Sequence, residues 1–546
     1  MAAVAVWGIG AIGAESVPGR YVWPLSDQTK VTAGFCDWRP GHYHGGIDIT
    51  TGGTEGLDVR AADSGWVMRL STSYWGYGKA VYLQMHDGRI AVYGHLSEFA
   101  PAIQKYVEQE QYASRRYGQN LFPAPGELPI GRGDVIAKTG QTGGGPPHLH
   151  FEIRTGQNRP LNPLVFGFEK PDAVAPTIKA VTIVPRPPIR PKDRPVSING
   201  GWMPVTITME GPADSRRLTE TPVVTGAVGL SILVEDGIDG DRYVLSPYRL
   251  RAWVNDQPVA QVTYDSINYS HTHLIDLERR IDPRPGLAPR SVNLFRRVHN
   301  VLWHYTDMVN EGWLVPGETL IPGANIVRVE ASDIAGNTSS AEFGLMLVEK
   351  SPAPDPTRTG NLPTEVTYQA SEGGLVVFFP QTSGDGPARC CRDSECADPL
   401  YSIPVPGGVA TWLSPDEGLD AIWVSYGDST PTEHALPWTS VRREEGGTVV
   451  SAAGDASVTI GPDDLFRHTY MALTVAPAPS HPPQPLSLLY EFAPFDAAFA
   501  RAVRLAIAQP VNSPDPAKVG VYRFRGPARG WDFEGAGRDS ARGVVT

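Results

Sequence analysis

Two histidines stand two residues apart behind a glycine- and proline-rich approach, in the stretch from Gly143 to Ile153. If this stretch is a strand, His148 and His150 lie on one face, and the apolar residues between and after them lie on the other. The two imidazoles then converge on one point, which indicates a metal site. Two nitrogen atoms leave the coordination of a zinc ion incomplete, so further donors are needed.

Residues 44–48, with the sequence HGGID, supply such donors. A catalytic zinc ion has three protein ligands and one open position for water. Three protein ligands are available if one His and one Asp of this stretch act together with one His of the later pair. The other His of the pair is then free to act as a base. His42 competes with His44 as a ligand, because it lies two residues before it. The spacing to Asp48 favours His44.

A fifth candidate is His95, in the segment Tyr93-Gly94-His95-Leu96. This segment closes an apolar stretch that follows a turn signal at Asp87-Gly88, so we expect two strands joined by a hairpin turn. The pattern predicts that His95 stands at the end of the second strand.

These three motifs, HGGID, YGHL and GPPHLHFEI, occur in this order and are followed by Asn162-Pro163. Together they resemble the LytM/lysostaphin-type family of zinc endopeptidases, which cut the peptides of peptidoglycan. The local departure from the family pattern is Pro146-Pro147 before the histidine pair, where the family usually has a single proline. This departure touches no expected ligand.

The resemblance assigns a role to each candidate. It implies that His44, Asp48 and His150 hold one Zn²⁺ ion, and that His95 and His148 are the catalytic histidines. With zinc lowering the pKa of its water to about 7, His148 would take the proton of that water. His95 would support the oxyanion or relay the proton, and which histidine performs which step stays open.

The chain contains a second His-x-His pattern, at His271 and His273. It has no glycine- and proline-rich approach and no His-x-x-x-Asp motif nearby. We therefore interpret it as an ordinary strand surface and not as a metal site.

The composition favours short strands and many turns: the 546 residues include 58 glycines and 51 prolines. A net charge of −12 argues against nucleic acid as a partner, because phosphate recognition needs a basic surface. We expect a mainly β protein of several domains.

The first predicted domain, residues 20–170, is the zinc peptidase domain. The resemblance implies an antiparallel β-sandwich of the lipoyl-like hybrid-motif type for it. Residues 97–118 carry the one helical pattern, with Ser97 as its cap and Gly118 as its stop, inside an insertion at residues 97–126. We expect this insertion to form one wall of the substrate cleft. The alternative is that its apolar side packs as scaffold.

Residues 174–349 alternate as in an immunoglobulin-like β domain. A proline-rich linker follows at residues 350–363, and a β-rich C-terminal region at residues 364–546, which residues 477–485 divide into two candidate units. The pattern predicts strands at residues 519–524 and 530–533 and none after Gly537. Either the C-terminus is a disordered tail or the sequence is a fragment, and the second alternative is favoured.

Residues 1–16 are apolar and small, which is typical of a signal peptide, although the positive n-region is missing and suggests a start further upstream. No stretch qualifies as a membrane helix. Export to the periplasm or cell surface is the consistent interpretation. A local disulfide from Cys396 to Cys390 or Cys391 would fit that compartment, and Cys36 is expected to be a small buried residue.

The sequence thus predicts a zinc-dependent endopeptidase for peptidoglycan cross-links, with bonds between D-Ala and a diamino acid favoured and glycyl bonds second. The alternative is a LytM-like protein without activity that regulates or activates cell-wall amidases. Five intact motif residues argue against this alternative.

Overall fold

The structure is a computed structural model that describes residues 21–546 except 27–28, 167, 169–170, 189–193, 213–215, 239–242, 281–290, 351, 353–363, 372, 382–385, 478–484, 486, 495–496, 510–518, 525–530, 536 and 540–543. The predicted signal peptide and most of the predicted linker lie outside these residues. The described residues form several β-sheets, which confirms the mainly β class. None of the helices in the described part is long and apolar enough to cross a membrane.

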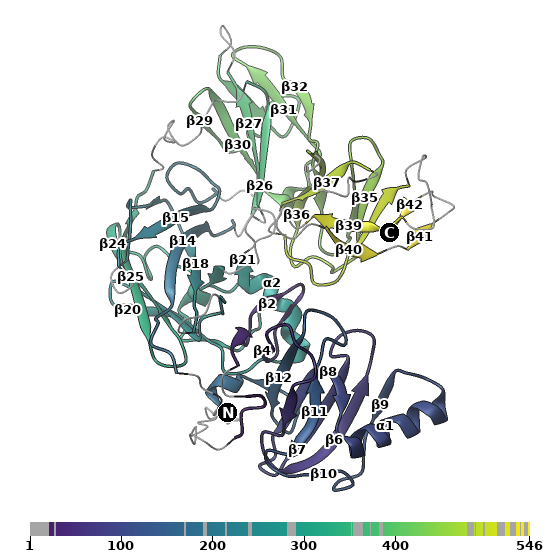
Figure 1. Cartoon of the computed structure of the whole chain (residues 1–546). Coiled ribbons are helices and arrows are strands. Elements are labelled where there is room, and N and C mark those ends of the chain that lie inside the picture. The colour runs from purple at the N-terminus through teal and green to yellow at the C-terminus, as the bar shows by residue number, and fades with distance from the viewer. Residues whose placement is uncertain are drawn as a thin grey trace, which may run out of the picture.

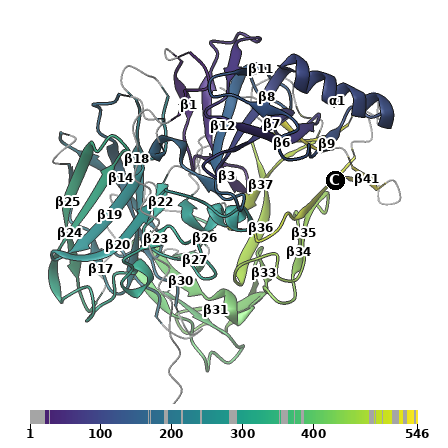
Figure 2. The ribbon, with the colours of Figure 1, turned by 90° about the horizontal axis from the view of Figure 1, so that it is seen from below.

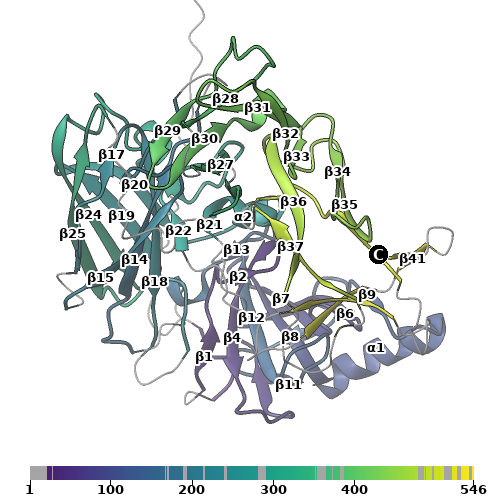
Figure 3. The same cartoon turned by 90° about the horizontal axis from the view of Figure 1, so that it is seen from above.

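We call residues 21–168 the first unit, residues 174–349 the second unit and residues 364–546 the C-terminal region. In Figure 1 the second unit (teal) lies between the first unit (purple and blue) and the green part of the C-terminal region. Helix α1 (Pro101–Ser114) stands at the outer edge of the first unit in all views (Figures 1, 2 and 3).

The first unit is built on one antiparallel sheet whose central strands carry the candidate residues. Its main path is β1 (Val31–Ala33), β4 (Ile47–Thr50), β12 (His148–Arg154), β8 (Ile90–Phe99), β7 (Lys79–Met85), β6 (Gly65–Thr72) and β10 (Pro129–Ile130). Attached to it are β5 (Asp58–Arg60), β9 (Gln119–Leu121), β11 (Val135–Thr139) and β13 (Pro160–Leu161), while β2 (Trp38–Arg39) pairs separately with β3 (His42–Tyr43).

The HGGID segment is a loop that enters strand β4, as expected from its two glycines. A Cβ atom on Gly46 would lie 2.3 Å from the carbonyl oxygen of Phe151. Only glycine therefore allows this loop to pass so close to the backbone of β12, and the close approach brings the loop's polar side chains next to those of β12.

The helix is shorter than predicted, because pairing with β11 keeps residues 96–99 in strand β8. Helix α1 begins at Pro101, a residue suited to a first helical turn. Ser97 does not cap it; its hydroxyl donates to the carbonyl oxygen of Thr139 at 2.8 Å. The helix ends at Ser114, and Arg115 follows with a left-handed φ of 53°, so Gly118 is not the stop.

The second unit contains two six-stranded sheets around a common core. One follows the order β16 (Arg217–Leu218), β15 (Val205–Glu210), β14 (Thr177–Pro185), β18 (Val228–Glu235), β22 (Ser291–Asn293) and β21 (Arg279–Arg280). The other follows β17 (Val223–Val224), β25 (Thr338–Leu347), β24 (Gly323–Ser332), β19 (Arg249–Val254), β20 (Gln257–Thr263) and β23 (Tyr305–Thr306). Its immunoglobulin-like character stays a prediction.

A loop of the first unit is part of the second unit's core. Phe35, Cys36 and Tyr43 are buried among its apolar side chains, which confirms the expectation for Cys36. The hydroxyl of Tyr43 donates to the carboxylate of Glu278, in the short helix α2 (Ile275–Glu278), at 2.7 Å. The backbone just before His44 is therefore held by the second unit.

The C-terminal region consists of small sheets. They are formed by β26 (Thr367–Ser371), β27 (Gly374–Pro380), β30 (Gly408–Leu413) and β29 (Ser402–Val405); by β28 (Ala388–Cys391), β31 (Ala421–Tyr426) and β32 (Thr432–Ala435); and by β33 (Thr439–Val441), β36 (Thr469–Ala476) and β37 (Leu489–Ala493). The others are formed by β34 (Gly447–Val450), β35 (Ala456–Ile460), β38 (Arg504–Ala508), β42 (Val544–Val545) and β41 (Arg538–Asp539), and by β39 (Val521–Phe524) and β40 (Trp531–Gly535).

Two expectations for this region can be compared with the structure. The disulfide joins Cys391 to Cys396, one of the two pairings left open, and Cys390 is a buried free thiol. The expectation of no strand after Gly537 is wrong: β41 and β42 follow it, and β42 pairs with β38. A strand of two residues is too short to show an alternation of apolar and polar residues, so the sequence pattern does not predict it.

A half-buried acidic side chain of the second unit makes stability depend on pH. Burial raises the pKa of Asp236 to about 8, and the nearby carboxylates of Asp333, Asp172 and Asp37 act in the same direction as burial, while a hydrogen bond from the Gly237 N–H opposes them. An unfolded aspartate has a pKa of about 4. The neutral form of Asp236 therefore makes its full contribution to the free energy of unfolding below pH 4, and this contribution is lost as the pH rises to about 8.

We predict that Asp236→Asn raises the melting temperature relative to the unchanged protein, because asparagine stays neutral. The difference should grow between pH 4 and pH 8 and reach about 5 °C or more at pH 8. Thermal unfolding followed by circular dichroism at several pH values measures it. The exposed Asp428→Asn is the control. A difference for Asp236→Asn that stays constant over this range contradicts the prediction.

Candidate metal centre

Strand pairing brings the two main motifs together. In the register of β12 with β4, His150 lies opposite Asp48, and on its other side β12 places His150 opposite Gly94 of β8. The residue after Gly94 is His95. Three neighbouring strands therefore deliver their polar side chains to one face of the sheet, as the period of two predicted for residues 148–153.

Three side-chain atoms form a nearly equilateral triangle. The distances from His44 Nε2 to Asp48 Oδ1, from His44 Nε2 to His150 Nδ1 and from His150 Nδ1 to Asp48 Oδ1 are each 3.0 Å. Within the described part of the chain, this is the group of His, Cys, Asp and Glu side chains that could hold a metal ion. His42, the competing candidate, is exposed and lies outside it; its Nδ1 atom contacts the carbonyl oxygen of Pro40.

The donor atoms fit a zinc ion in identity and in spacing. Ligand atoms at about 2.0–2.1 Å from a tetrahedral zinc ion lie about 3.3 Å from one another, close to the observed edges. Two imidazoles and one carboxylate, with room for water, form a donor group typical of catalytic zinc.

The hydrogen bonds fix which ring nitrogen of each candidate ligand has a free lone pair. His44 Nδ1 lies 2.7 Å from the carbonyl oxygen of Gly34, which can only accept, so Nδ1 carries the proton and Nε2 is free. His150 has the opposite tautomer, because its Nε2 donates to the carboxylate of Glu152 at 2.8 Å and leaves Nδ1 free. Both free nitrogen atoms point at Asp48.

The charges of this cluster are strongly coupled. Burial opposes ionisation of Asp48, but His44 and His150 outweigh it and hold the pKa of the carboxyl well below its usual range. Burial likewise opposes the charged form of His150, yet hydrogen bonds to Asp48 and Glu152 raise its pKa to about 9. The centre therefore attracts positive charge, which a metal ion can supply in place of a proton.

The two predicted catalytic histidines lie side by side next to the triangle. The ring centroids of His95 and His148 are 4.5 Å apart, and His148 Nε2 lies 3.7 Å from Asp48 Oδ1. His95 Nδ1 donates to the carbonyl oxygen of Thr142 at 2.8 Å, and His148 Nδ1 donates to that of Pro146 at 2.7 Å. Each ring thus keeps Nε2 free to accept a proton. The first proline of the unusual pair orients His148.

His95 does not stand at a strand end, as the sequence had indicated. Strand β8 continues to Phe99, and His95 occupies an irregularity within it, with a left-handed φ of 60°. Its N–H donates to the carbonyl oxygen of Tyr77 at 2.8 Å. The irregular backbone turns the imidazole toward His148, and burial lowers its pKa to about 4, which keeps it neutral.

Sequence reasoning missed the residues that hold the candidate ligands in place, above all Glu152. This carboxylate is fully buried and accepts from His150 and Arg154 and from the hydroxyls of Tyr77 and Tyr269, at 2.5–2.8 Å. The alternation of β12 could have revealed Glu152, because it lies two residues after His150 on the same face. Tyr269 belongs to the second unit, and nothing local in the sequence indicates its contact.

The second carboxylate oxygen of Asp48 accepts a hydrogen bond from a residue that belongs to none of the three sequence motifs. Arg39 Nη2 donates to Asp48 Oδ2 at 3.0 Å, which leaves Oδ1 facing the two histidines. Arg39 lies in β2, in the same loop that the second unit's core contains. Both candidate ligands of the first motif are therefore oriented through this loop.

The second His-x-His pattern is not a strand surface, contrary to the prediction, and it is not part of a metal group among the described residues. His271 and His273 lie in a 3-10 helix, residues Tyr269–Leu274. The side chain of Asn268 caps this helix by accepting from the N–H of Ser270, which explains why the segment leaves the extended conformation.

We predict that Glu152→Gln weakens zinc binding by about 10- to 100-fold and that Tyr269→Phe weakens it by about threefold to tenfold. The reason is that both changes loosen the orientation of His150. Competition with a chromophoric chelator measures the dissociation constant.

Tyr248→Phe is the matched control, since its hydroxyl donates to Asp265, away from the metal centre. Equal zinc affinity in Tyr269→Phe and Tyr248→Phe would show that the second unit does not support the centre.

The first unit is similar to known peptidases. Residues 42–115 match the model of a family described as Peptidase family M23. The DD-carboxypeptidase/endopeptidase Mpg of Neisseria meningitidis is 30% identical over 136 residues, 25% of this chain and 24% of that protein. The outer membrane antigenic lipoprotein B of Haemophilus influenzae is 26% identical over 138 residues, 25% of this chain and 27% of that protein.

Among solved structures, the catalytic domain of lysostaphin from Staphylococcus simulans is 22% identical and covers 26% of this chain and 97% of that chain, with a TM-score of 0.19. The chain spans about a quarter of the length of the two curated relatives. The resemblance to the LytM/lysostaphin-type peptidases is thus confirmed, in the first unit.

Proposed function

We propose that this protein is a zinc-dependent endopeptidase that hydrolyses the peptide cross-links of bacterial peptidoglycan. The observation that carries the proposal is the triangle of His44 Nε2, Asp48 Oδ1 and His150 Nδ1 beside two further histidines with free Nε2 atoms. The match to a peptidase family and the similarity to an endopeptidase support it.

In this proposal His44, Asp48 and His150 hold one zinc ion. Bound there, zinc would polarise the scissile carbonyl group and make a water molecule acidic. His148 accepts the proton of that water at Nε2, because its Nδ1 is occupied by the Pro146 carbonyl. Burial keeps His95 neutral, with its Nδ1 proton on the Thr142 carbonyl oxygen and its Nε2 free. His95 therefore stabilises the oxyanion or protonates the leaving amine only after its Nε2 has taken up a proton.

We further propose bonds between D-Ala and a diamino acid as the favoured substrate, with glycyl bonds as the second choice. The similarity to a protein named DD-carboxypeptidase/endopeptidase supports the first choice. Export to the periplasm or cell surface follows from this substrate, and the similarity to an outer membrane lipoprotein agrees with it.

We predict that the zinc-loaded protein cleaves purified cross-linked muropeptides and that a chelator abolishes the cleavage. Mass spectrometry of the products gives the bond that is cut. His150→Ala and Asp48→Ala should lose both zinc and activity, whereas His148→Ala should keep most of its zinc and lose at least about 100-fold in kcat, since it acts on the proton.

The controls are His271→Ala and His273→Ala, which should change neither zinc content nor turnover. Products that are only glycan fragments would refute the peptide-bond assignment. A fully zinc-loaded protein without any turnover would favour the regulator of wall amidases. A zinc-free His148→Ala beside a fully loaded His44→Ala would reverse the roles of these histidines.

The insertion after β8 reaches the site through aromatic contacts. Ile103 and Val107 of helix α1 pack into the first unit's core, so the helix itself serves as scaffold. Tyr117, which follows the helix, packs on Tyr74 at a centroid distance of 4.7 Å. The loop that carries Tyr74 also carries Tyr77, whose ring lies 5.2 Å from that of His150. We propose that this aromatic pair forms one wall of the substrate cleft.

We predict that Tyr74→Ala and Tyr117→Ala each lower kcat/KM for cross-linked muropeptides by about tenfold and leave cleavage of a minimal tetrapeptide within about twofold, because only the larger substrate reaches the wall. Parallel assays on both substrates measure this. Tyr112→Ala, a change at an exposed position of the same insertion, is the control. An equal loss on both substrates, or an unchanged rate on both, contradicts the cleft wall.

A further inference from the structure

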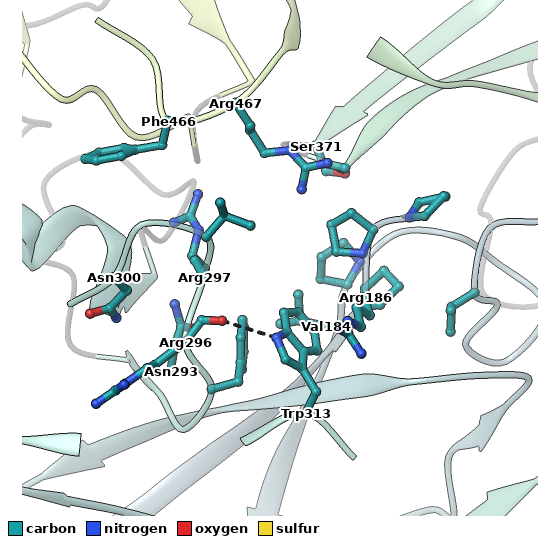
Figure 4. A pocket seen from close by; sticks show the side chains of 18 of the residues that line it. Val184, Arg186, Asn293, Arg296, Arg297, Asn300, Trp313, Ser371, Phe466 and Arg467 are labelled. Atoms are coloured by element: carbon teal, nitrogen blue, oxygen red, sulfur yellow. Dashed lines mark hydrogen bonds between the residues drawn. The ribbon is translucent and has the colours of Figure 1, made fainter. Parts of the chain in front are cut away.

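A cavity whose lining residues are remote in sequence from the metal centre lies between the second unit and the C-terminal region. Its volume is about 750 Å³, within the range of sites for small organic ligands. Figure 4 shows Arg296 and Arg297 on the side of the second unit, and Arg467 and Ser371 across the space from them on the side of the C-terminal region.

The lining is strongly basic although the whole chain has a net charge of −12. Seven arginines contribute to it, against three acidic residues. The arginines are Arg186, Arg279, Arg280, Arg296, Arg297, Arg443 and Arg467, and the acidic residues are Glu311, Asp416 and Glu444. Cations gathered in a partly enclosed space repel one another and attract an anion.

Protein carboxylates neutralise only some of these arginines. Arg279 pairs with Glu278 at 3.2 Å, Arg296 with Glu311 at 3.4 Å and Arg443 with Asp463 at 3.1 Å. Arg186 and Arg467 form no ion pair with any residue in the described part of the chain. The guanidinium of Arg186 lies over the ring of Trp313, 5.7 Å from its centroid. Two unpaired cations therefore approach the cavity from opposite walls.

Buried donor groups without partners give an independent indication. The Nε1 of Trp412, the Nδ2 of Asn300 and the Nε of Arg296 and Arg467 are buried atoms that have no hydrogen-bond acceptor among the described residues. Trp412 and Asn300 are each only 6% exposed. The Oδ1 of Asn293 is the one such acceptor in the lining. Among these buried atoms of the lining, donors outnumber acceptors, which suits a ligand that is rich in acceptor oxygens.

We propose that this cavity binds a small organic polyanion with at least two phosphate or carboxylate groups. Arg186 would hold one group from the second unit and Arg467 another from the C-terminal region. The indole N–H of Trp412 and the amide of Asn300 would complete the shell of donors. A divalent or trivalent anion bridges the two walls, whereas a monovalent anion reaches only one of them.

The test is a titration of the full-length protein with tripolyphosphate and with citrate by isothermal calorimetry, with acetate at equal ionic strength as the monovalent reference. We expect saturable binding of a polyanion at one site, no saturation by acetate, and a higher melting temperature with the bound anion. Arg467→Gln and Arg186→Gln should each weaken binding by about tenfold or more, and Trp412→Phe by about threefold to tenfold.

Arg504→Gln, at an exposed position on β38 outside the cavity, is the matched control and should bind as the unchanged protein does. Both probes chelate metal ions, but all these variants share the same metal centre, so extraction of metal contributes equally and cancels in the comparison. Binding of only one probe identifies phosphate or carboxylate as the recognised group. Absence of saturable binding, or equal affinity in Arg467→Gln and Arg504→Gln, overturns the proposal.

Discussion

The candidate metal centre depends on the hydrogen bonds of one buried carboxylate group, that of Glu152. A charged group without exposure to water is tolerated only when its oxygens are fully hydrogen-bonded. Glu152 meets this condition with two donors on each oxygen: Tyr77 and His150 on Oε1, Arg154 and Tyr269 on Oε2. Removal of any one donor leaves part of a buried charge unsatisfied, so the geometry of His150 is coupled to residues from β12, from the loop before β7 and from the second unit.

Because of this coupling, the second unit helps to orient the candidate ligands and is more than a connection between domains. Tyr269 reaches Glu152, and the core of the second unit contains the loop that presents Arg39 and His44. The two units meet through buried polar contacts as well as apolar ones, for example between Arg279 and the carbonyl oxygen of Cys36. A rigid junction of this kind holds ligands in place that come from separate strands.

Much of the site could be predicted from the sequence, because its motifs follow local rules. The period of two in β12 placed His148 and His150 on one face, and the glycines of residues 44–48 indicated a loop before a strand. The family resemblance then related His44, Asp48 and His95 to that face. The local sequence pattern was sufficient to predict the place of a residue wherever that place depended only on the residue's own strand.

The other features depend on contacts between distant parts of the chain. Tyr269 lies 117 positions from Glu152. Strand β8 extends through the expected helix cap at Ser97 because β11, far along the chain, pairs with it. The left-handed backbone at His95 likewise depends on contacts with residues that are distant in the sequence. The hairpin signal alone therefore predicted the wrong end for strand β8. Long-range pairing overrides local propensity at each of these positions.

The burial of Tyr43 in the second unit has a consequence for how the molecule is made. Its hydroxyl binds Glu278, 235 positions later in the chain. At a ribosomal rate of about 5–20 residues per second, roughly 10–50 s pass between the synthesis of these two residues. During that interval the loop before His44 lacks the core in which it is later buried, so the second unit does not yet support the metal centre on the nascent first unit. In a chain assembled in this order, the candidate ligands acquire the support of the second unit only after that unit has been translated and folded.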